Sequence, residues 1–204
     1  IVFGDWSSDV CSSDLHADIL KLSLPELAEG TRYTLVSNVP YSISGPFLAK
    51  LVLEAEGLEG AVLMLQSEVA SRMAARPGAA VYGSLSVLLG CYYQVEPLFK
   101  VSASAFMPKP QVSSQVLRVT PLAAPLLAWA EAPALEALLR ASFGSRRKQL
   151  VNSLKHHLQA TSPEALANAL RAAGISGEAR AEQLSPQQFA SLVTGCQESG
   201  VRLL

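Results

Sequence analysis

Cysteine is scarce in this chain of 204 residues, which excludes several kinds of site. The three cysteines, Cys11, Cys91 and Cys196, are far apart and odd in number. Such separations support neither a disulfide framework nor the closely spaced pairs of a zinc site. The sequence therefore predicts no metal ligands, and so few thiols are typical of the reducing cytoplasm.

Long hydrophobic runs are missing too. The apolar stretches, such as residues 61–65, are far shorter than the ~20 residues that cross a bilayer, and no basic and apolar leader opens the chain. Half of the residues are hydrophobic and only 16% are charged, which allows a sizeable core. We therefore expect a soluble, cytoplasmic monomer without a membrane partner.

A large excess of charge of one sign is absent as well, but the net charge of −1 hides an asymmetry. Residues 1–120 carry 8 Lys and Arg against 11 Asp and Glu, whereas residues 121–204 carry 8 against 6. The densest basic cluster is Arg146-Arg147-Lys148. Any contact with a polyanion is therefore expected in the C-terminal part.

Hydrophobic patterning divides the chain into three parts. Residues 1–15 contain a tandem Ser/Asp repeat without strand or helix periodicity, which is typical of a tail or of sequence foreign to a domain. Residues 16–120 alternate strand-like and helical patterns, which predicts an α/β sheet with an antiparallel edge. Residues 121–204 are Leu-, Ala- and Arg-rich and predict a helical domain. The expected strands are residues 33–37, 61–65 (buried on both faces), 92–95, 98–101 and 115–119; the expected helices are one opened by Gly45-Pro46, then 68–75, 84–91, 133–143, 145–159, 163–173 and 186–197, with Ser162 and Ser185 as N-caps.

The tetrad Asn38-Val39-Pro40-Tyr41 is the most informative stretch of the chain. Proline holds φ near −65° and keeps the preceding residue extended, so the strand before it ends in a fixed elbow. The elbow offers the Asn38 side chain and two backbone carbonyls as acceptors beside the Tyr41 ring. The amino group of a flat base needs this combination, because its N–H groups require acceptors and its π face requires a stacking partner. The alternative is a strand-to-helix turn that merely contains these residues.

A second stretch, Phe106-x-Pro108-x-Pro110, is a stiff loop. Two prolines at this spacing favour an extended backbone that can hold Phe106 as a rigid wall. Alternatively, the stretch is a proline-rich loop between strands whose Phe belongs to the core.

The third stretch is the basic cluster, which the pattern places at the start of helix 145–159, with Lys155 one heptad after Lys148. Cations at a helix N-terminus oppose the macrodipole, and an anionic partner such as an RNA phosphate would offset that cost. Solvated surface is the alternative.

Asp18 carries a weaker signal. It is an ordinary turn residue unless it ends a strand, in which case it lies at the carboxyl edge of a sheet, where ligands bind. The histidines His16, His156 and His157 form no catalytic pairing, and no nucleophile and base pattern is visible.

Together and in this order, these motifs resemble those of the ribosomal RNA adenine dimethyltransferases. That family uses S-adenosylmethionine to dimethylate two adjacent adenines near the 3′ end of small-subunit (16S) rRNA. The resemblance runs from about His16 to the C-terminus. The segments that carry it are His16-Ala17-Asp18-Ile19-Leu20, Asn38-Val39-Pro40-Tyr41, residues 65–72, residues 82–87, residues 106–114, Phe143-x-x-Arg146-Arg147-Lys148-Gln149-Leu150 and Glu182-Gln183-Leu184-Ser185.

The resemblance implies a Rossmann-like methyltransferase sheet in residues 16–120 and a small all-α rRNA-binding domain in residues 121–204. It implies the following roles: Asn38, Pro40 and Tyr41 in catalysis; Asp18 and Asn38 in cofactor binding; Tyr41 and Phe106 in base stacking; Arg146, Arg147, Lys148 and Lys155 in RNA binding. The implied partner is 16S rRNA or the immature small ribosomal subunit.

One departure from the family pattern concerns the cofactor. The family begins with a strand, a glycine-rich turn and an acidic residue for the ribose, and none of these is present in this sequence. We therefore expect an incomplete sheet that lacks its first strands. Two alternatives stay open: an inactive fragment that binds rRNA or the immature subunit, and an N6-adenine methyltransferase for another nucleic acid.

Overall fold

A four-stranded sheet forms the N-terminal part of the computed structural model, which describes residues 15–145, 148–158 and 162–203. β1 and β2 are parallel, whereas β4 pairs antiparallel with both of its neighbours. The predicted α/β sheet with antiparallel pairing is thus confirmed. The spatial order of the strands is β1 (Tyr33–Asn38), β2 (Leu58–Gln66), β4 (Ser114–Pro121) and β3 (Tyr93–Val101).

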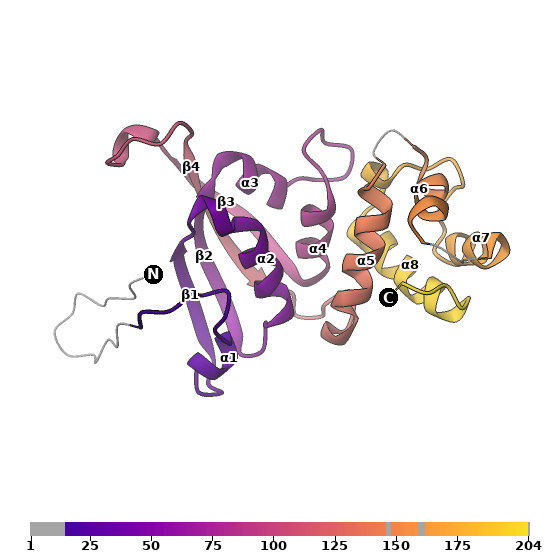
Figure 1. The fold of residues 1–204 in the computed structure, drawn as a ribbon, viewed down its shortest axis with the longest axis horizontal. Helices are drawn as coiled ribbons and strands as arrows, with labels where there is room; N and C mark the ends of the chain where they lie inside the picture. Colours follow the sequence, from indigo (N-terminus) through magenta and orange to yellow (C-terminus); the bar gives the residue numbers. More distant parts are fainter. Residues whose placement is uncertain (1–14, 146–147, 159–161, 204) are drawn as a thin grey trace.

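Three helices lie over one face of the sheet, namely α2 (Ser44–Leu53), α3 (Ser67–Met73) and α4 (Ser84–Tyr92) (Figure 1). The strands alternate accordingly, so that Leu35 of β1 is buried whereas its neighbour Val36 is 62% exposed. β2 likewise alternates between buried and half-buried positions over most of its length. The prediction that residues 61–65 are buried on both faces is therefore wrong, because the second face of the sheet is only partly covered.

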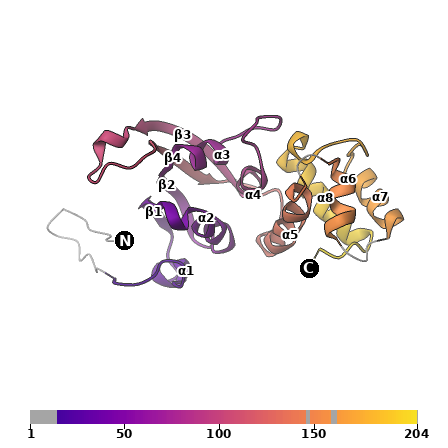
Figure 2. The same ribbon diagram turned by 45° about the horizontal axis from the view of Figure 1, so that its top comes forward.

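In the described residues of the C-terminal part, four α-helices lie at the end of the molecule away from β1 (Figures 1 and 2). Two of their N-caps are the predicted serines: Ser162 accepts from the N–H groups of the first turn of α7, and Ser185 accepts from Gln188 N at 3.2 Å. Serine followed by proline suits a helix start, because proline has no N–H to leave unpaired. These helices are α5 (Ala132–Phe143), α6 (Leu150–His157), α7 (Pro163–Ala172) and α8 (Pro186–Glu198).

The sheet and the helical part share one hydrophobic core, which continues from α4 into α5 and α8. The Tyr82 hydroxyl donates to Leu184 O at 2.7 Å across this junction, and Gly90 of α4 packs against the Pro186 ring. A boundary near residue 121, and with it the division into 16–120 and 121–204, stays a prediction. Residues 1–14, which contain most of the Ser/Asp repeat, lie outside the described residues.

Two predicted elements differ from those observed. Residues 92–95 and 98–101 belong to one strand, β3, whose register with β4 shifts between Pro97 and Phe99. The helix predicted for 145–159 begins only at Leu150, with Gln149 as its extended N-cap residue. Lys148 therefore precedes the helix, so its predicted place at the start of helix 145–159 is wrong, whereas Arg146 and Arg147 lie outside the described residues. Among the described residues, no helix is long and apolar enough to cross a membrane.

Candidate active site

The candidate site lies along one edge of the sheet, where β1 and β2 end and β4 begins. The strand register pairs Asn38 with Met64 near the ends of β1 and β2. It then pairs Gln66 with Ser114, and Ser114 with Val101 at the end of β3. This register brings the tetrad and the two ends of the 102–113 loop to the same edge, although they are more than 60 residues apart in the sequence.

The elbow after β1 has the shape that its sequence predicts. Val39 is buried and its N–H donates to Met64 O at 3.0 Å, which extends the ladder one residue past the strand. Pro40 has φ −57° and ψ 135°, and a short 3₁₀ helix, Tyr41–Ile43, follows it. Asn38 lies on the exposed face of β1, between the buried Ser37 and Val39, so its side chain is directed away from the core.

The carbonyl of Pro40 already accepts two hydrogen bonds. Ile43 N donates to it at 3.1 Å and Ser44 Oγ at 3.3 Å. The Ser44 hydroxyl also lies 3.3 Å from Tyr41 O, so it has a second acceptor within reach. A carbonyl oxygen has two lone pairs. Pro40 O can therefore receive a hydrogen from a base only when the Ser44 hydroxyl turns to Tyr41 O.

Tyr41 reaches across the end of β2 to the first residue of β4. Its phenol oxygen lies 2.8 Å from Ser114 Oγ, and Ser114 is only 1% exposed. Beside this pair, Ser67 and Ser113 join their hydroxyls at 2.9 Å, and Ser67 N donates to Ser113 O. Sequence reasoning gave these serines no role, although Ser113 and Ser114 directly follow the proline-rich stretch.

Phe106 lies in the 102–113 loop, which joins β3 to β4 and projects beyond the sheet (Figure 1). The ring is half-buried and its backbone is extended, after the 3₁₀ helix Ala103–Ala105. The next residue, Met107, is fully exposed. The loop thus brings Phe106 to the same end of the sheet as Tyr41. Stacking of the two rings about one base stays a prediction.

Comparison with known proteins decides the family. The model of the ribosomal RNA adenine dimethylases matches residues 11–198. The chain belongs to this family. A ribosomal RNA small subunit methyltransferase A from Shouchella clausii is 38% identical over 184 residues, covering 87% of this chain and 62% of the relative. A ribosomal RNA small subunit methyltransferase A from Xanthomonas campestris is 40% identical over 178 residues, covering 87% of this chain and 65% of the relative. The chain thus spans somewhat less than two thirds of the length of these curated relatives.

Solved structures support the same fold. A dimethyladenosine transferase from Plasmodium falciparum superposes with a TM-score of 0.74 at 25% identity, covering 92% of this chain and 73% of that one. The 23S rRNA methyltransferase ErmE superposes with a TM-score of 0.62 at 26% identity, covering 90% of this chain and 71% of that one. The Rossmann-like fold expected from the sequence is therefore confirmed.

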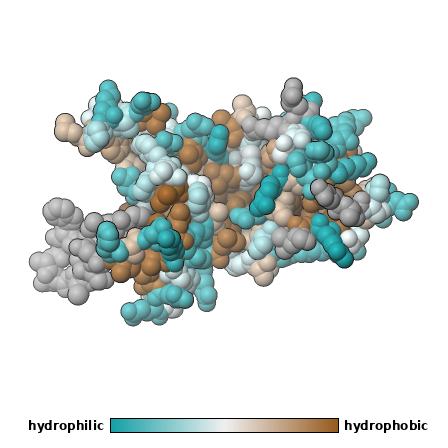
Figure 3. Space-filling model, in the orientation of Figure 1, coloured by the Kyte–Doolittle hydropathy of each residue, from teal (hydrophilic) through white to brown (hydrophobic). Residues whose placement is uncertain are grey.

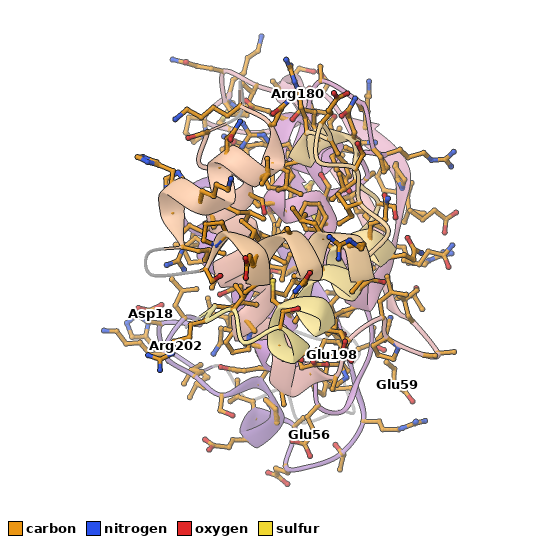
Figure 4. The ribbon with its side chains drawn as sticks, turned by 90° about the vertical axis from the view of Figure 1, so that its right-hand side faces the viewer. Asp18, Glu56, Glu59, Arg180, Glu198 and Arg202 are labelled. Carbon is orange, nitrogen blue, oxygen red and sulfur yellow. The ribbon has the colours of Figure 1, made fainter. Side chains whose placement is uncertain are left out.

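In this adenine dimethylase family member, Asp18 is an exposed turn residue rather than the end of a strand. Its Oδ1 accepts from Leu20 N at 3.0 Å, and its Oδ2 lies 3.9 Å from Lys21 Nζ. Figure 4 shows Asp18 at the periphery of the molecule, at the left edge of the view, whereas Glu59 lies at the right edge. The carboxylate is held in place by its own turn, yet its second oxygen can still accept a hydrogen from an adenine amino group.

A cavity of about 500 Å³ opens beside β1. Apolar and polar side chains are mixed on the visible face of this part of the molecule (Figure 3). Ala17 and Ile19, the residues on either side of Asp18, line it together with Leu35 of β1. Its lining is mainly apolar, and Asp18 borders it without lining it. The cavity lies along the first half of β1, and none of the tetrad residues lines it. Binding of S-adenosylmethionine there stays a prediction, and the described residues that line the cavity include no glycine.

The residues predicted to bind RNA are only partly described. Arg146 and Arg147 lie outside the described residues, whereas Lys148 is exposed immediately before α6. Lys155 lies in the last turn of α6, where a cation is favoured by the macrodipole. Lys148 and Lys155 do not share a helix face, because only Lys155 belongs to the helix. Their contact with RNA stays a prediction.

Proposed function

We propose that this chain serves the S-adenosylmethionine-dependent N6,N6-dimethylation of two adjacent adenines near the 3′ end of 16S rRNA, as a step in small-subunit biogenesis. Membership of the adenine dimethylase family supports the reaction type. The observation that carries the assignment to this edge is the hydrogen bond between Tyr41 and Ser114, which ties the tetrad to the strand that follows the Phe106 loop. This bond supports the proposal that the tetrad and the Phe106 loop hold the same base.

The chemical problem is the weak nucleophilicity of adenine N6, whose lone pair is delocalised into the ring. An acceptor on an N6 hydrogen helps to localise that lone pair and to orient it. The Asn38 amide oxygen, on the exposed face at the end of β1, is the acceptor we assign. S-adenosylmethionine, when bound, supplies the electrophilic methyl group. The proton that N6 loses passes to solvent, so the chain contributes orientation and electrostatics rather than a strong base.

The remaining residues hold the two reactants. Tyr41 and Phe106 stack on the displaced base, a contribution of about 1–3 kcal/mol per base. Asp18 accepts from the adenine of the cofactor. Lys148, Lys155 and the neighbouring arginines contact rRNA phosphates, which fix register without reading sequence. Pro40 contributes its carbonyl only after the Ser44 hydroxyl has turned away.

The test is methylation of unmethylated small subunits with radiolabelled cofactor, comparing the wild type with Asn38→Ala. We expect a loss of at least a hundredfold in the methylation rate with RNA affinity unchanged, because Asn38 acts on the reacting amine. Asn168→Ala is the matched control, since Asn168 is an exposed asparagine on α7 whose Oδ1 accepts from its helix neighbour Arg171 at 3.1 Å. Joint loss of RNA binding and methylation in Asn38→Ala would refute its assigned role.

A second candidate function is rRNA binding without methyl transfer. The observation in its favour is that Asp18 is held by partners in its own turn and that neither Asp18 nor the tetrad lines the cavity beside β1. Calorimetric titration with S-adenosylmethionine separates the two candidates. Saturable heat supports the methyltransferase, and its absence together with retained rRNA binding supports the binding module. Methylation of another nucleic acid, the third reading, is tested by offering 23S rRNA and DNA as competing substrates.

A further inference from the structure

We propose that Ser114 is a positioning residue that sets the orientation of the Tyr41 ring against the target base. This inference rests on the proposed function and deepens it. Ser114 begins β4, the strand two places from β1, and it is 1% exposed. A hydroxyl that deep needs a hydrogen-bond partner. The partner is the Tyr41 phenol, at 2.8 Å.

The pair anchors the tyrosine at both ends. The backbone of Tyr41 is held by the 3₁₀ helix that follows Pro40, and the phenol oxygen is held by β4. A tyrosine ring has two rotatable bonds, and fixing its far atom removes most of their freedom. A base that stacks on this ring therefore meets a preset plane. The position of that plane depends on the register of the sheet rather than on the elbow alone.

The same bond couples the tetrad to the Phe106 loop. Ser114 is the residue at which the 102–113 loop re-enters the sheet. Ser113, one residue earlier, is fastened to Ser67 by a hydroxyl pair at 2.9 Å and by the backbone bond from Ser67 N. The C-terminal end of the loop is thus bonded to the start of α3 and to the 3₁₀ helix Tyr41–Ile43. Ser114 therefore joins Tyr41 to the point at which the loop that carries Phe106 returns to the sheet.

The role predicts a specific pattern in kinetics. Ser114→Ala should lower kcat about tenfold, which is roughly the effect of one lost hydrogen bond, while KM for rRNA stays within twofold. Tyr41→Phe removes the same bond from the other side, keeps the ring and leaves β4 untouched. It should therefore reproduce the loss even if Ser114→Ala folds poorly. Because both changes delete one interaction, the double variant should be no slower than either single variant.

Ser142→Ala is the matched control. It deletes another buried hydroxyl, whose hydrogen bond to Leu138 O at 2.7 Å lies in α5 and does not involve Tyr41, and it should leave kcat within twofold of the wild type. A purely structural role of Ser114 predicts a different result. In that case the Ser114→Ala and Tyr41→Phe losses multiply to about a hundredfold in the double variant, which would overturn the proposal. Wild-type kcat in Tyr41→Phe would overturn it as well.

A fluorescence measurement, which is independent of catalysis, accompanies the kinetic comparison of the single and double variants. The probe is an rRNA 3′ fragment with 8-vinyladenine, a fluorescent base that keeps the 6-amino group, in place of the first of the two adjacent adenines. Stacking on an aromatic ring quenches this base, so the wild type should quench it and both single variants should restore emission, at unchanged affinity by anisotropy. Quenching retained in both variants refutes the positioning role alone. A wild-type chain that binds the fragment without quenching refutes base capture at this edge, and the proposed function with it.

Discussion

Replacement of Gly90 by alanine should loosen the junction between the sheet and the helical part. A Cβ atom built at Gly90 lies 2.8 Å from Pro186 Cγ and 3.4 Å from Pro186 Cβ. A proline ring cannot rotate away as a flexible side chain would, and Pro186 is the first residue of α8. The clash must therefore be relieved by movement of α4 against α8.

The size of the effect follows from two opposing contributions. Overpacking a core contact costs about 1–3 kcal/mol. Alanine in place of a helical glycine returns up to about 1 kcal/mol of propensity. Gly45 of α2 supplies the control, because a Cβ there meets nothing within 4 Å and gains a similar propensity. Gly90→Ala should thus be about 1–3 kcal/mol less stable than Gly45→Ala, or roughly 2–12 °C lower in Tm for a chain of this size.

The assay is thermal and urea unfolding of wild type, both glycine variants, Pro186→Ala and the double variant Gly90→Ala with Pro186→Ala. Removal of Pro186 Cγ should turn the Gly90→Ala change from a loss into a gain of up to about 1 kcal/mol, since the atom at 2.8 Å is gone and the helix propensity of alanine remains. An equal loss in both backgrounds would refute the contact as its cause. So would a Gly90→Ala variant as stable as Gly45→Ala.

Two further predictions concern pH and salt. Burial raises the pKa of the Cys91 thiol from its ordinary value of 9.0 to about 12. Between pH 9 and 12 the unfolded chain therefore loses this proton while the folded chain keeps it. The free energy of unfolding is consequently unaffected by this thiol below pH 9 and falls as the pH rises from 9 to 12. Urea unfolding between pH 8 and 10 should show a loss of about 1 kcal/mol per pH unit above pH 9 that shrinks in Cys91→Ala; an unchanged slope would contradict the burial argument. Replacement of Arg146, Arg147 and Lys148 by glutamate should weaken rRNA binding and reduce the slope of log K against log salt, and the assignment to phosphates fails if anisotropy shows the same slope as in the wild type.

The sequence predicted the fold class and the place of the tetrad because both depend on local rules. Proline after an apolar run fixes an elbow, and the serine and proline pairs at 162 and 185 mark helix starts. Prediction from the sequence failed where a tertiary contact determines the structure of a segment. The helix expected from residue 145 begins at Leu150, since Gln149 is extended and Leu150 N donates to Ala179 O at 2.8 Å. Such a bond to a residue 29 positions away leaves no trace in a helical pattern.

The site shows the same limit. Asn38 and Tyr41 could be singled out by the elbow, but Ser114 could not, because its bond to Tyr41 joins residues 73 positions apart across an intervening strand. Periodicity says which residues share a face, whereas the pairing of distant strands requires the register. The sequence also could not show that the Pro40 carbonyl already accepts a hydrogen bond from Ser44 Oγ, because that bond depends on the turn that Ser44 completes.

Under the proposed function, the free acceptors at the elbow determine which residue binds each hydrogen of adenine N6. Adenine N6 carries two hydrogens before the first methyl transfer and one before the second. Asn38 supplies one acceptor at both stages. Pro40 O accepts from Ile43 N and Ser44 Oγ, and it becomes available only when the Ser44 hydroxyl turns to Tyr41 O, which lies at the same 3.3 Å distance. The second hydrogen therefore depends on a low-cost exchange of acceptors by Ser44, whereas the monomethylated base needs Asn38 alone. An elbow built in this way accepts both forms of the base without a change in its backbone.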